Sequence, residues 1–264
     1  MRQIKSVCIL GAGNVATHFG KSIKNAGIKV SQIYNRSEEA GIELAGKLGC
    51  NYISDLNKIN ETADIILFVV SDSAIVPILK SRNWENKFLV HTSGSIPSEI
   101  FYNYTNKFGV IYPLQTFSKE REIDFSTIPL FISANTPGNF DLLSSFCEKL
   151  SKSVFETDSD KKAILHLAAV FANNFSNHMF SIADELLKKK HLPLELLFPL
   201  IEETAFKAIK MNPRKAQTGP AFRNNFEVLK KQTEMLAAEP EWQKIYTFVS
   251  ESIQKYYNSR DDKF

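Results

Sequence analysis

The stretch Val7-Cys8-Ile9-Leu10-Gly11-Ala12-Gly13-Asn14-Val15-Ala16 decides the fold, because an apolar run breaks at two glycines and then resumes as an amphipathic helix. The run itself predicts a strand that is buried on both faces. Gly11 permits a tight turn, Gly13 lets a ligand approach the backbone without meeting a Cβ, and Ala16 allows the helix to pack closely on the strand. A strand, a tight turn and a helix start are therefore expected in this order.

This turn predicts a dinucleotide-binding site, because the free N–H groups and the dipole of the helix start suit a diphosphate. The residues expected there are Gly11, Gly13, Asn14 and Val15. The alternative is a glycine turn that packs and binds nothing, since such short motifs also occur without a ligand.

The residues that follow the second predicted strand, residues 28–34, bear on the choice of cofactor. NAD-selective sites usually place Asp or Glu about 20 residues beyond the glycines, where the charge holds the ribose 2′-hydroxyl. Here the position holds neutral Asn35, followed by Arg36 and Ser37. The planar guanidinium of Arg36 suits a phosphate, so we expect NADP rather than NAD. The alternative is that Arg36 is a surface residue next to the N-cap of a helix, and the negative charges of Glu38 and Glu39 weaken the case for a phosphate site.

Strands alternate with helices along the first part of the chain. Further strands are expected at residues 52–53, 63–70, 88–91, 110–112, 129–133 and 153–155. The alternation predicts an α/β fold with a doubly wound, mostly parallel Rossmann sheet. Ligands of such sheets lie at the carboxyl ends of the strands, where this chain places Ser71, Asp72 and the loop that contains Gln115.

Beyond residue 157 the apolar residues recur at helical spacing and no strand pattern returns. We therefore expect an NADP-binding Rossmann domain over residues 1–156 and an all-helical substrate and dimerisation domain over residues 157–264. Because this helical domain is small and apolar, a homodimer is expected.

A polar, uncharged stripe marks the first long helix of the second part. His166, Asn173 and Asn177 are separated by nearly whole numbers of helical turns, and Asn174 lies beside them. Such a stripe suits a cleft wall that hydrogen-bonds a carbonyl or a small substrate. The alternative is that the amides satisfy backbone groups between helices or line a subunit interface. His166, Asn173 and Asn174 are the candidate catalytic residues, and His166 is the candidate acid, with an ordinary pKa of about 6.5.

A second candidate for substrate binding is the turn that contains Thr218 and Gly219, to which we add Gln115. A glycine turn before a helix exposes N–H groups that can bind a carboxylate. The alternative is that Gly-Pro only marks a turn before a helix and binds nothing. No spacing of histidines or cysteines suggests a metal ligand set, and the Tyr-x-x-x-Lys pair of short-chain dehydrogenases is absent from the sequence.

Composition excludes several other classes of protein. The net charge is only +3 and no long basic run exists, so nucleic acid is not an expected partner. No apolar run approaches the roughly 18 residues of a membrane span. The three cysteines form no C-x-x-C motif, and no segment of signal-peptide form precedes the first predicted strand. We expect a soluble cytoplasmic protein that binds a small-molecule substrate.

Six motifs together resemble one family of proteins. They are the glycine turn at Gly11 and residues 35–37, 91–95, 112–116, 166–174 and 218–220. The chain resembles the Rossmann-like proteins with a C-terminal helical domain of unknown function. These are similar to pyrroline-5-carboxylate reductases, prephenate dehydrogenases and β-hydroxyacid dehydrogenases, which bind substrate between a Rossmann domain and a dimer-forming helical domain. The resemblance implies NADP at the motif residues, with Ser71, Asp72 and Ser93 near the nicotinamide.

The sequence also departs from those relatives. β-Hydroxyacid dehydrogenases carry a catalytic lysine one helical turn before an asparagine, and here those positions hold Ala169 and Val170. Two hypotheses therefore stand. The first is an NADP-dependent oxidoreductase that transfers a hydride to or from a small ketone, imine or hydroxy acid. The second is a non-catalytic NADP-binding sensor or assembly module, which the missing lysine favours.

Overall fold

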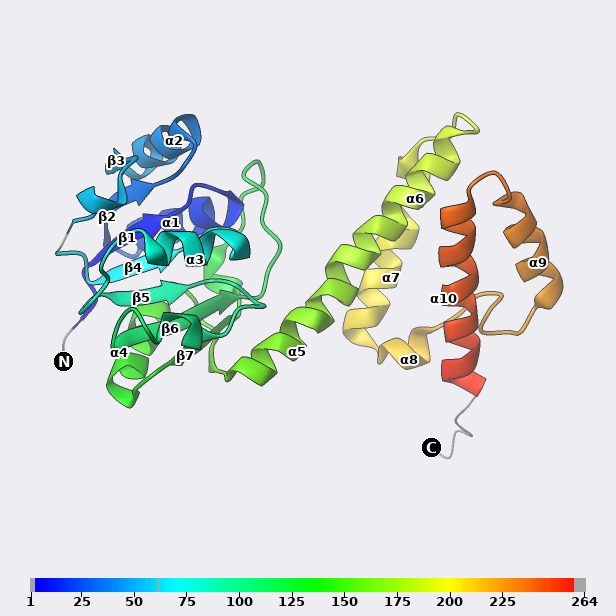
Figure 1. Cartoon of the computed structure of the whole chain (residues 1–264). Coiled ribbons are helices and arrows are strands. Elements are labelled where there is room, and N and C mark those ends of the chain that lie inside the picture. The colour runs from blue at the N-terminus through cyan, green and yellow to red at the C-terminus, as the bar shows by residue number, and fades with distance from the viewer. Residues whose placement is uncertain (1–2, 61, 259–264) are drawn as a thin grey trace. The chain divides into compact units, whose positions relative to one another are not determined.

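The computed structural model describes residues 3–60 and 62–258. The chain forms two compact units, Met1–Asn174 and Phe175–Phe264 (Figure 1). A sheet organises the first unit, and the second consists of helices. The predicted domain division after residue 156 stays a prediction. It coincides with the end of the last strand, whereas the first compact unit continues through one further helix and a π-helical turn.

One eight-stranded sheet lies at the centre of the first unit, in the order β3-β2-β1-β4-β5-β6-β7-β8. Its strands are β1 (Ser6–Leu10), β2 (Lys29–Tyr34), β3 (Asn51–Ile53), β4 (Ile65–Phe68), β5 (Phe88–His91), β6 (Lys107–Pro113), β7 (Leu130–Ala134) and β8 (Val154–Glu156). All neighbouring strands run parallel except β6 and β7. The expected mostly parallel sheet is confirmed. The strand order reverses between β1 and β4, the point at which doubly wound sheets bind ligands.

Helices cover both faces of this sheet. One face carries α1 (Asn14–Asn25), α2 (Glu38–Leu48) and α4 (Pro137–Cys147), and the other carries α3 (Asp72–Lys80). Successive residues of a strand point to opposite faces. Ile65 and Leu67 of β4 therefore join the first core, while Ile66 and Phe68 join the second. This explains why the central strands are apolar at every position.

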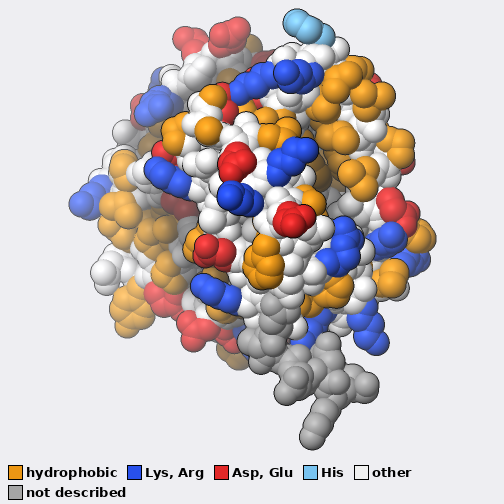
Figure 2. All heavy atoms as spheres, turned by 90° about the vertical axis from the view of Figure 1, so that its right-hand side faces the viewer, with side chains coloured by type: hydrophobic (Ala, Val, Ile, Leu, Met, Phe, Trp, Pro, Cys, Tyr) orange, Lys and Arg blue, Asp and Glu red, His pale blue; other side chains and the backbone are white. Residues whose placement is uncertain are grey.

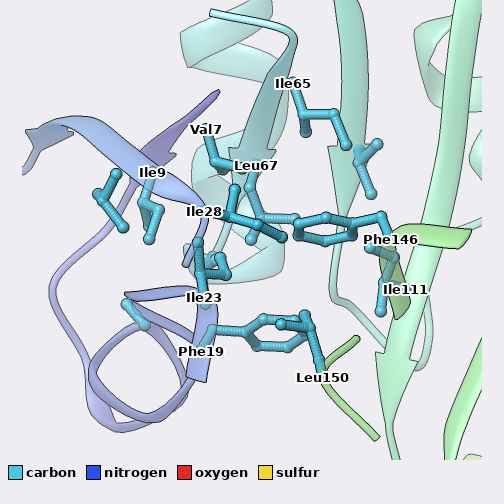
Figure 3. Packing of buried hydrophobic residues seen from close by; sticks show 14 of the residues in the cluster. Val7, Ile9, Phe19, Ile23, Ile28, Ile65, Leu67, Ile111, Phe146 and Leu150 are labelled. Carbon is cyan, nitrogen blue, oxygen red and sulfur yellow. The ribbon is translucent and has the colours of Figure 1, made fainter. Parts of the chain in front are cut away.

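The larger core holds α1 against the sheet (Figure 3). Phe19 and Ile23 of α1 are fully buried and pack in one cluster with Val7 and Ile9 of β1. Phe146 of α4 is buried in the same cluster. Each such side chain contributes about 1.5–3 kcal/mol through burial. The core therefore fixes the start of α1 at the end of β1.

The helix that follows the sheet is not regular throughout. Helix α5 (Ser159–Ala169) is capped at its N-terminus by Asp158, whose Oδ1 accepts a hydrogen bond of 2.7 Å from the backbone N–H of Lys161. It is followed by a π-helical turn, η4 (Val170–Phe175). The stripe predicted above assumed regular α-helical spacing, and the wider π-helical turn changes that spacing between His166 and Asn177.

The second unit contains the remaining helices. They are α6 (Ser176–Lys188), α7 (Phe198–Lys210), α8 (Pro213–Ala216), α9 (Phe226–Met235) and α10 (Pro240–Asn258). Pro240 begins the last helix, and the N-cap of α9 is Asn225, whose side chain accepts a hydrogen bond from the N–H of Val228. No helix among the described residues is both long and apolar enough to cross a membrane.

The helical unit buries little of its own apolar surface. Among its described residues only Ala221 and Leu236 are buried hydrophobic side chains. Ile209, Phe206 and Phe248 are exposed, and Figure 2 shows apolar side chains in orange beside charged ones on one face of the molecule. Within this unit, large apolar side chains of the helices therefore stay exposed.

Candidate dinucleotide-binding and active site

Gly11 is required by the fold itself. Its φ of +120° is unfavourable for residues with a side chain, and a Cβ built there would lie 2.1 Å from the carbonyl oxygen of Val69. Its N–H donates a 2.7 Å hydrogen bond to the carbonyl of Tyr34 at the end of β2. The first glycine thus allows β1 to turn between the neighbouring strands β2 and β4.

Gly13 leaves open space at the start of α1. A Cβ built there would meet no atom within 4 Å, and its φ of −80° is accessible to any residue. No side chain caps the helix, so the N–H groups of the first turn face this space without a side-chain acceptor. An uncapped helix start beside an open glycine is the arrangement on which the predicted pyrophosphate site depends, and the site itself stays a prediction.

The loop beyond β2 holds the residues that were expected to choose the cofactor. The Asn35 side chain donates a 2.8 Å hydrogen bond to the carbonyl of Ser37, and the Tyr52 hydroxyl donates to the carbonyl of Asn35. Ser37 precedes α2 but makes no side-chain cap hydrogen bond. Arg36 is exposed. The Asn35 amide therefore orders the loop, while Arg36 and Ser37 stay exposed.

The exits of β4 and β5 are joined by polar contacts. Ser71 precedes α3, and the carboxylate of Asp72 accepts a hydrogen bond from the Ser95 hydroxyl. The Ser93 hydroxyl accepts hydrogen bonds from the N–H groups of Ser95 and Ile96, at 3.2 and 3.1 Å. The predicted residues Ser71, Asp72 and Ser93 thus belong to one hydrogen-bonded pair of loops at the carboxyl edge of the sheet.

His91 holds the base of the second loop. Its Nδ1 accepts from the N–H of Ser93 at 3.2 Å, and its Nε2 lies 3.4 Å from the carbonyl of Pro97 and donates to it. Burial lowers the pKa of His91 to about 3, and the nearby charge of Lys162 acts in the same direction. The imidazole is therefore neutral at physiological pH and supports the loop.

A cavity of about 670 Å³ in the first unit joins several of the predicted residues. The predicted residues that line it are Asn14, Val15, Gln115, His166, Asn173 and Asn174. They come from the start of α1, the loop after β6, helix α5 and the π-helical turn. Residues more than 150 positions apart in the chain therefore lie around one space, next to the glycine turn.

Tyr112 lines the same cavity and is a residue that the sequence reasoning did not assign to the site. Its hydroxyl oxygen lies 3.1 Å from Nδ1 of His166, and the two rings meet edge to face with centroids 5.9 Å apart. Burial raises the pKa of Tyr112, so the phenol keeps its proton and can donate it to Nδ1. The only sequence signal for Tyr112 was its place in the motif at residues 112–116.

Gly94 fits against this pair with no space left for a side chain. A Cβ built there would lie 2.5 Å from Nδ1 of His166 and 2.9 Å from the ring of Tyr112. The loop after β5 is therefore in direct contact with the candidate acid.

Asn173 and Asn174 lie in the π-helical turn, and their side chains are exposed. The Asn173 amide donates a long hydrogen bond of 3.5 Å to Oδ1 of Asn174. Such turns are frequent at functional sites, because the wider turn directs side chains that a regular helix would place elsewhere. Two exposed amides at the cavity wall are suited to hydrogen-bond a polar ligand.

The remaining substrate-binding candidates are separated along the chain. Gln115 is exposed, and its side chain accepts from the N–H of Thr116. Thr218 and Gly219 belong to the second compact unit, where Gly219 has a φ of +107°. The helix expected directly after them does not form there, because residues 220–224 make hydrogen-bonded turns before α9 begins.

Neither a second groove nor a metal-binding cluster forms part of this site in the described residues. A larger open groove, of about 990 Å³, is lined by the start of β6 and the ends of β7 and β8. It lies away from the glycine turn and from the carboxyl ends of the parallel strands β1, β2, β4 and β5. No group of three or more His, Cys, Asp or Glu side chains that could hold a metal ion occurs in the part of the chain that the structure describes.

The fold and the cavity define a Rossmann-type protein with a dinucleotide-binding turn. Residues 6–94 match the family described as NADP oxidoreductase, coenzyme F420-dependent, and residues 128–253 match the domain of unknown function DUF2520. No curated protein matches the chain in sequence. The structure of BF3122 from Bacteroides fragilis, provisionally assigned as an NADP oxidoreductase, is 40% identical with a TM-score of 0.90, over 95% of this chain and 98% of that one.

More distant structures share the fold. An imine reductase from Myxococcus stipitatus in complex with NADP⁺ is 16% identical, with a TM-score of 0.66 over 96% of this chain and 93% of that one. A 1-pyrroline-5-carboxylate reductase from Streptococcus pyogenes is 12% identical, with a TM-score of 0.62 over 95% and 98%. The chain belongs to the family of oxidoreductases that join an NADP-oxidoreductase Rossmann domain to a DUF2520 domain.

Proposed function

We propose that the chain uses NADP(H) to transfer a hydride to or from a small ketone, imine or hydroxy acid. The observation that carries the proposal is the single cavity in which the start of α1 meets Tyr112 and His166. The glycine turn would receive the diphosphate, and Arg36 with Ser37 would receive the 2′-phosphate. The bound nicotinamide supplies or accepts the hydride, and the protein orients the partners and excludes water.

The chain's own residues would handle the proton and the polar end of the substrate. Reduction of a carbonyl or imine needs one hydride at carbon and one proton at oxygen or nitrogen. The Tyr112 phenol can donate a hydrogen bond to Nδ1 of His166, so that the ring proton lies on Nε2. As the Nε2 proton passes to the substrate, Nδ1 would take the phenol proton, and solvent would then return a proton to the phenolate. Asn173 and Asn174 would hydrogen-bond the substrate, as would Gln115. We propose Thr218 and Gly219 as a site for a substrate carboxylate.

Calorimetric titration with NADPH and NADH tests the cofactor assignment. Arg36→Ala removes one charge-assisted phosphate contact, which costs about 1.5–3 kcal/mol, or roughly ten- to a hundredfold in affinity, for NADPH alone. Lys29→Ala removes an exposed cation at the opposite end of β2 and serves as the matched control. Equal losses of affinity for NADPH and NADH in Arg36→Ala would contradict the role of Arg36. If the wild type binds neither nucleotide, the proposed function is wrong.

Turnover separates an enzyme from a sensor. NADPH oxidation at 340 nm is measured with a series of small cyclic imines, ketones and oxo acids, on the wild type and on Asn173→Ala and His166→Gln. We expect turnover with at least one substrate class and a loss of at least tenfold in His166→Gln. Tight NADPH binding with no turnover, and no effect of Asn173→Ala on binding, would instead support the non-catalytic module.

We further propose that a second copy of this chain covers the apolar helices of the second unit. Its described residues bury little apolar surface, and large side chains such as Ile209, Phe248 and Met235 are 73–79% exposed. Exposed apolar patches of this kind mark association surfaces. Light scattering at micromolar concentration should give about twice the 29.9 kDa of one chain. A mass equal to that of one chain at micromolar concentration would refute the dimer.

A further inference from the structure

Lys162 is a buried lysine close to the proposed site. It lies on α5, its side chain is 1% exposed, and it is the only buried residue of that helix. Lysines are almost never fully buried unless their charge has partners. Here the ammonium donates to two backbone carbonyls, that of Ser93 at 3.0 Å and that of Ile96.

Both carbonyls belong to the loop after β5. Inside that loop the Ser93 hydroxyl accepts from two N–H groups, and Ser95 is tied to Asp72 of α3. Those contacts hold the loop to itself and to the exit of β4. Lys162 provides the hydrogen bonds that tie the loop to α5.

The same helix and loop meet a second time at the candidate acid. His166 follows Lys162 by four residues, so both side chains leave α5 on one face. Gly94 lies between the two carbonyls that Lys162 holds, and its Cα is packed so tightly on His166 that an added Cβ would lie 2.5 Å from Nδ1. The position of the ammonium and that of the imidazole are thus coupled through one short loop.

Packing alone does not explain a lysine at this place. Burial lowers the pKa of Lys162 to about 8. The carboxylates of Asp72 on α3 and of Glu99, in the short 3-10 helix Ser98–Phe101, oppose that shift. His91 of β5 faces the same charge and stays neutral. The fold thus bears a desolvation cost that an apolar side chain of similar volume would avoid.

We propose that Lys162 is a positioning residue, which clamps the loop after β5 onto α5 and thereby fixes Gly94 against His166. Its effect on turnover rests on the proposed function, whereas its effect on the loop does not. Removal of the ammonium should loosen residues 92–97 and release the imidazole, while the glycine turn at β1 stays intact.

Amide hydrogen exchange on the free protein tests the clamp. Lys162→Met removes the donors and keeps an unbranched chain, and Lys161→Met is the matched control, because that neighbour is exposed and pairs with Asp158 at the surface. We expect exchange at residues 92–97 at least tenfold faster in Lys162→Met alone, with altered NMR signals of the His166 ring. Rates within twofold of the wild type would overturn the proposal. Should Lys162→Met not fold, Lys162→Gln is judged by the same limits.

The pH dependence provides a readout that a purely packing role would not move. In the wild type, loop protection should fall as pH rises above about 8, because the ammonium loses its proton there. Lys162→Arg stays charged, so its protection should persist to higher pH. Equal pH dependence in both proteins would contradict the clamp.

Kinetics then separates this inference from the proposed function. With a substrate found by the NADPH screen, Lys162→Met should lower kcat at least tenfold and leave the KM for NADPH within twofold. An unchanged kcat alongside a loosened loop would overturn the positioning role. If the wild type turns over no substrate, the proposed function fails, and the exchange data still decide whether the clamp exists.

Discussion

The hydroxyl oxygen of Tyr112 lies 3.1 Å from Nδ1 of His166, although 54 positions separate the two residues in the chain. Tyr112 is at the end of strand β6, and His166 is on helix α5. The phenol is buried, its pKa is raised, and it therefore remains a hydrogen-bond donor over the physiological range. When the phenol donates to Nδ1, the ring proton of His166 lies on Nε2.

Tyr112→Phe should remove this control with little change to the fold. A phenylalanine keeps the ring packing and loses one hydrogen bond, which costs about 1 kcal/mol of stability. We expect NADPH affinity within twofold of the wild type and kcat reduced by about ten- to a hundredfold, since acid–base groups contribute at least that much. Calorimetry and steady-state kinetics provide the two measurements. Unchanged kcat would exclude Tyr112 from the proton path.

Gly94→Ala should displace the same pair from the loop side. The added Cβ would overlap Nδ1 of His166, and overpacking of this kind costs about 1–3 kcal/mol. Gly138→Ala is the control, because a Cβ there meets nothing within 4 Å. We expect a lower unfolding midpoint in urea and shifted NMR signals of the His166 ring in Gly94→Ala only. Equal behaviour of the two variants would show that the loop is free to move away.

The two glycines of the first turn should respond in opposite ways to alanine. Gly11→Ala meets a backbone oxygen at 2.1 Å and a φ of +120°, so a loss on the order of 2–4 kcal/mol is expected. Gly13→Ala meets nothing and should keep stability within about 1 kcal/mol. It should nevertheless weaken NADPH binding at least tenfold, because its methyl group enters the space assigned to the diphosphate. Unimpaired binding by Gly13→Ala would place the diphosphate elsewhere.

Acid should destabilise the fold through His91. Its pKa is about 3 in the folded state and near 6.5 when unfolded, so between these values the unfolded chain binds more protons and stability falls with falling pH. At pH 5 this amounts to about 2 kcal/mol relative to neutral pH. Urea unfolding at pH 7 and pH 5 should show a smaller loss in His91→Gln than in the wild type. His178→Gln, at an exposed position, should follow the wild type; an identical loss in all three would refute the assignment.

Sequence reasoning predicted the sheet because local patterns fix it. The apolar runs at β1, β4 and β5 require burial on both faces, and Gly11 has the backbone freedom that the strand–helix turn needs. Arg36 was predicted to bind the 2′-phosphate because of its sequence separation from the glycines of the first turn. In the structure it is exposed, next to Ser37, whose side chain makes no cap hydrogen bond. These features depend on short stretches of chain, which is why one sequence was sufficient.

The centre of the site depended on tertiary structure. The packing of α5 against the loop after β5 brings His166 to Tyr112 and places Gly94 against both. No local sequence pattern predicts this packing. No pattern in the sequence singled out Lys162, and only its burial and its two carbonyl partners distinguish it. The π-helical turn likewise departs from the 3.6-residue period on which the polar stripe was predicted.

The sequence by itself thus determined the sheet and the first turn, because those follow from periodicity and from the conformations open to glycine, and its motifs indicated the family of the protein. Tertiary structure alone decided which polar groups meet. Hydrogen bonds between distant segments depend on how whole helices pack, and a change of one helical turn moves a side chain by several ångströms.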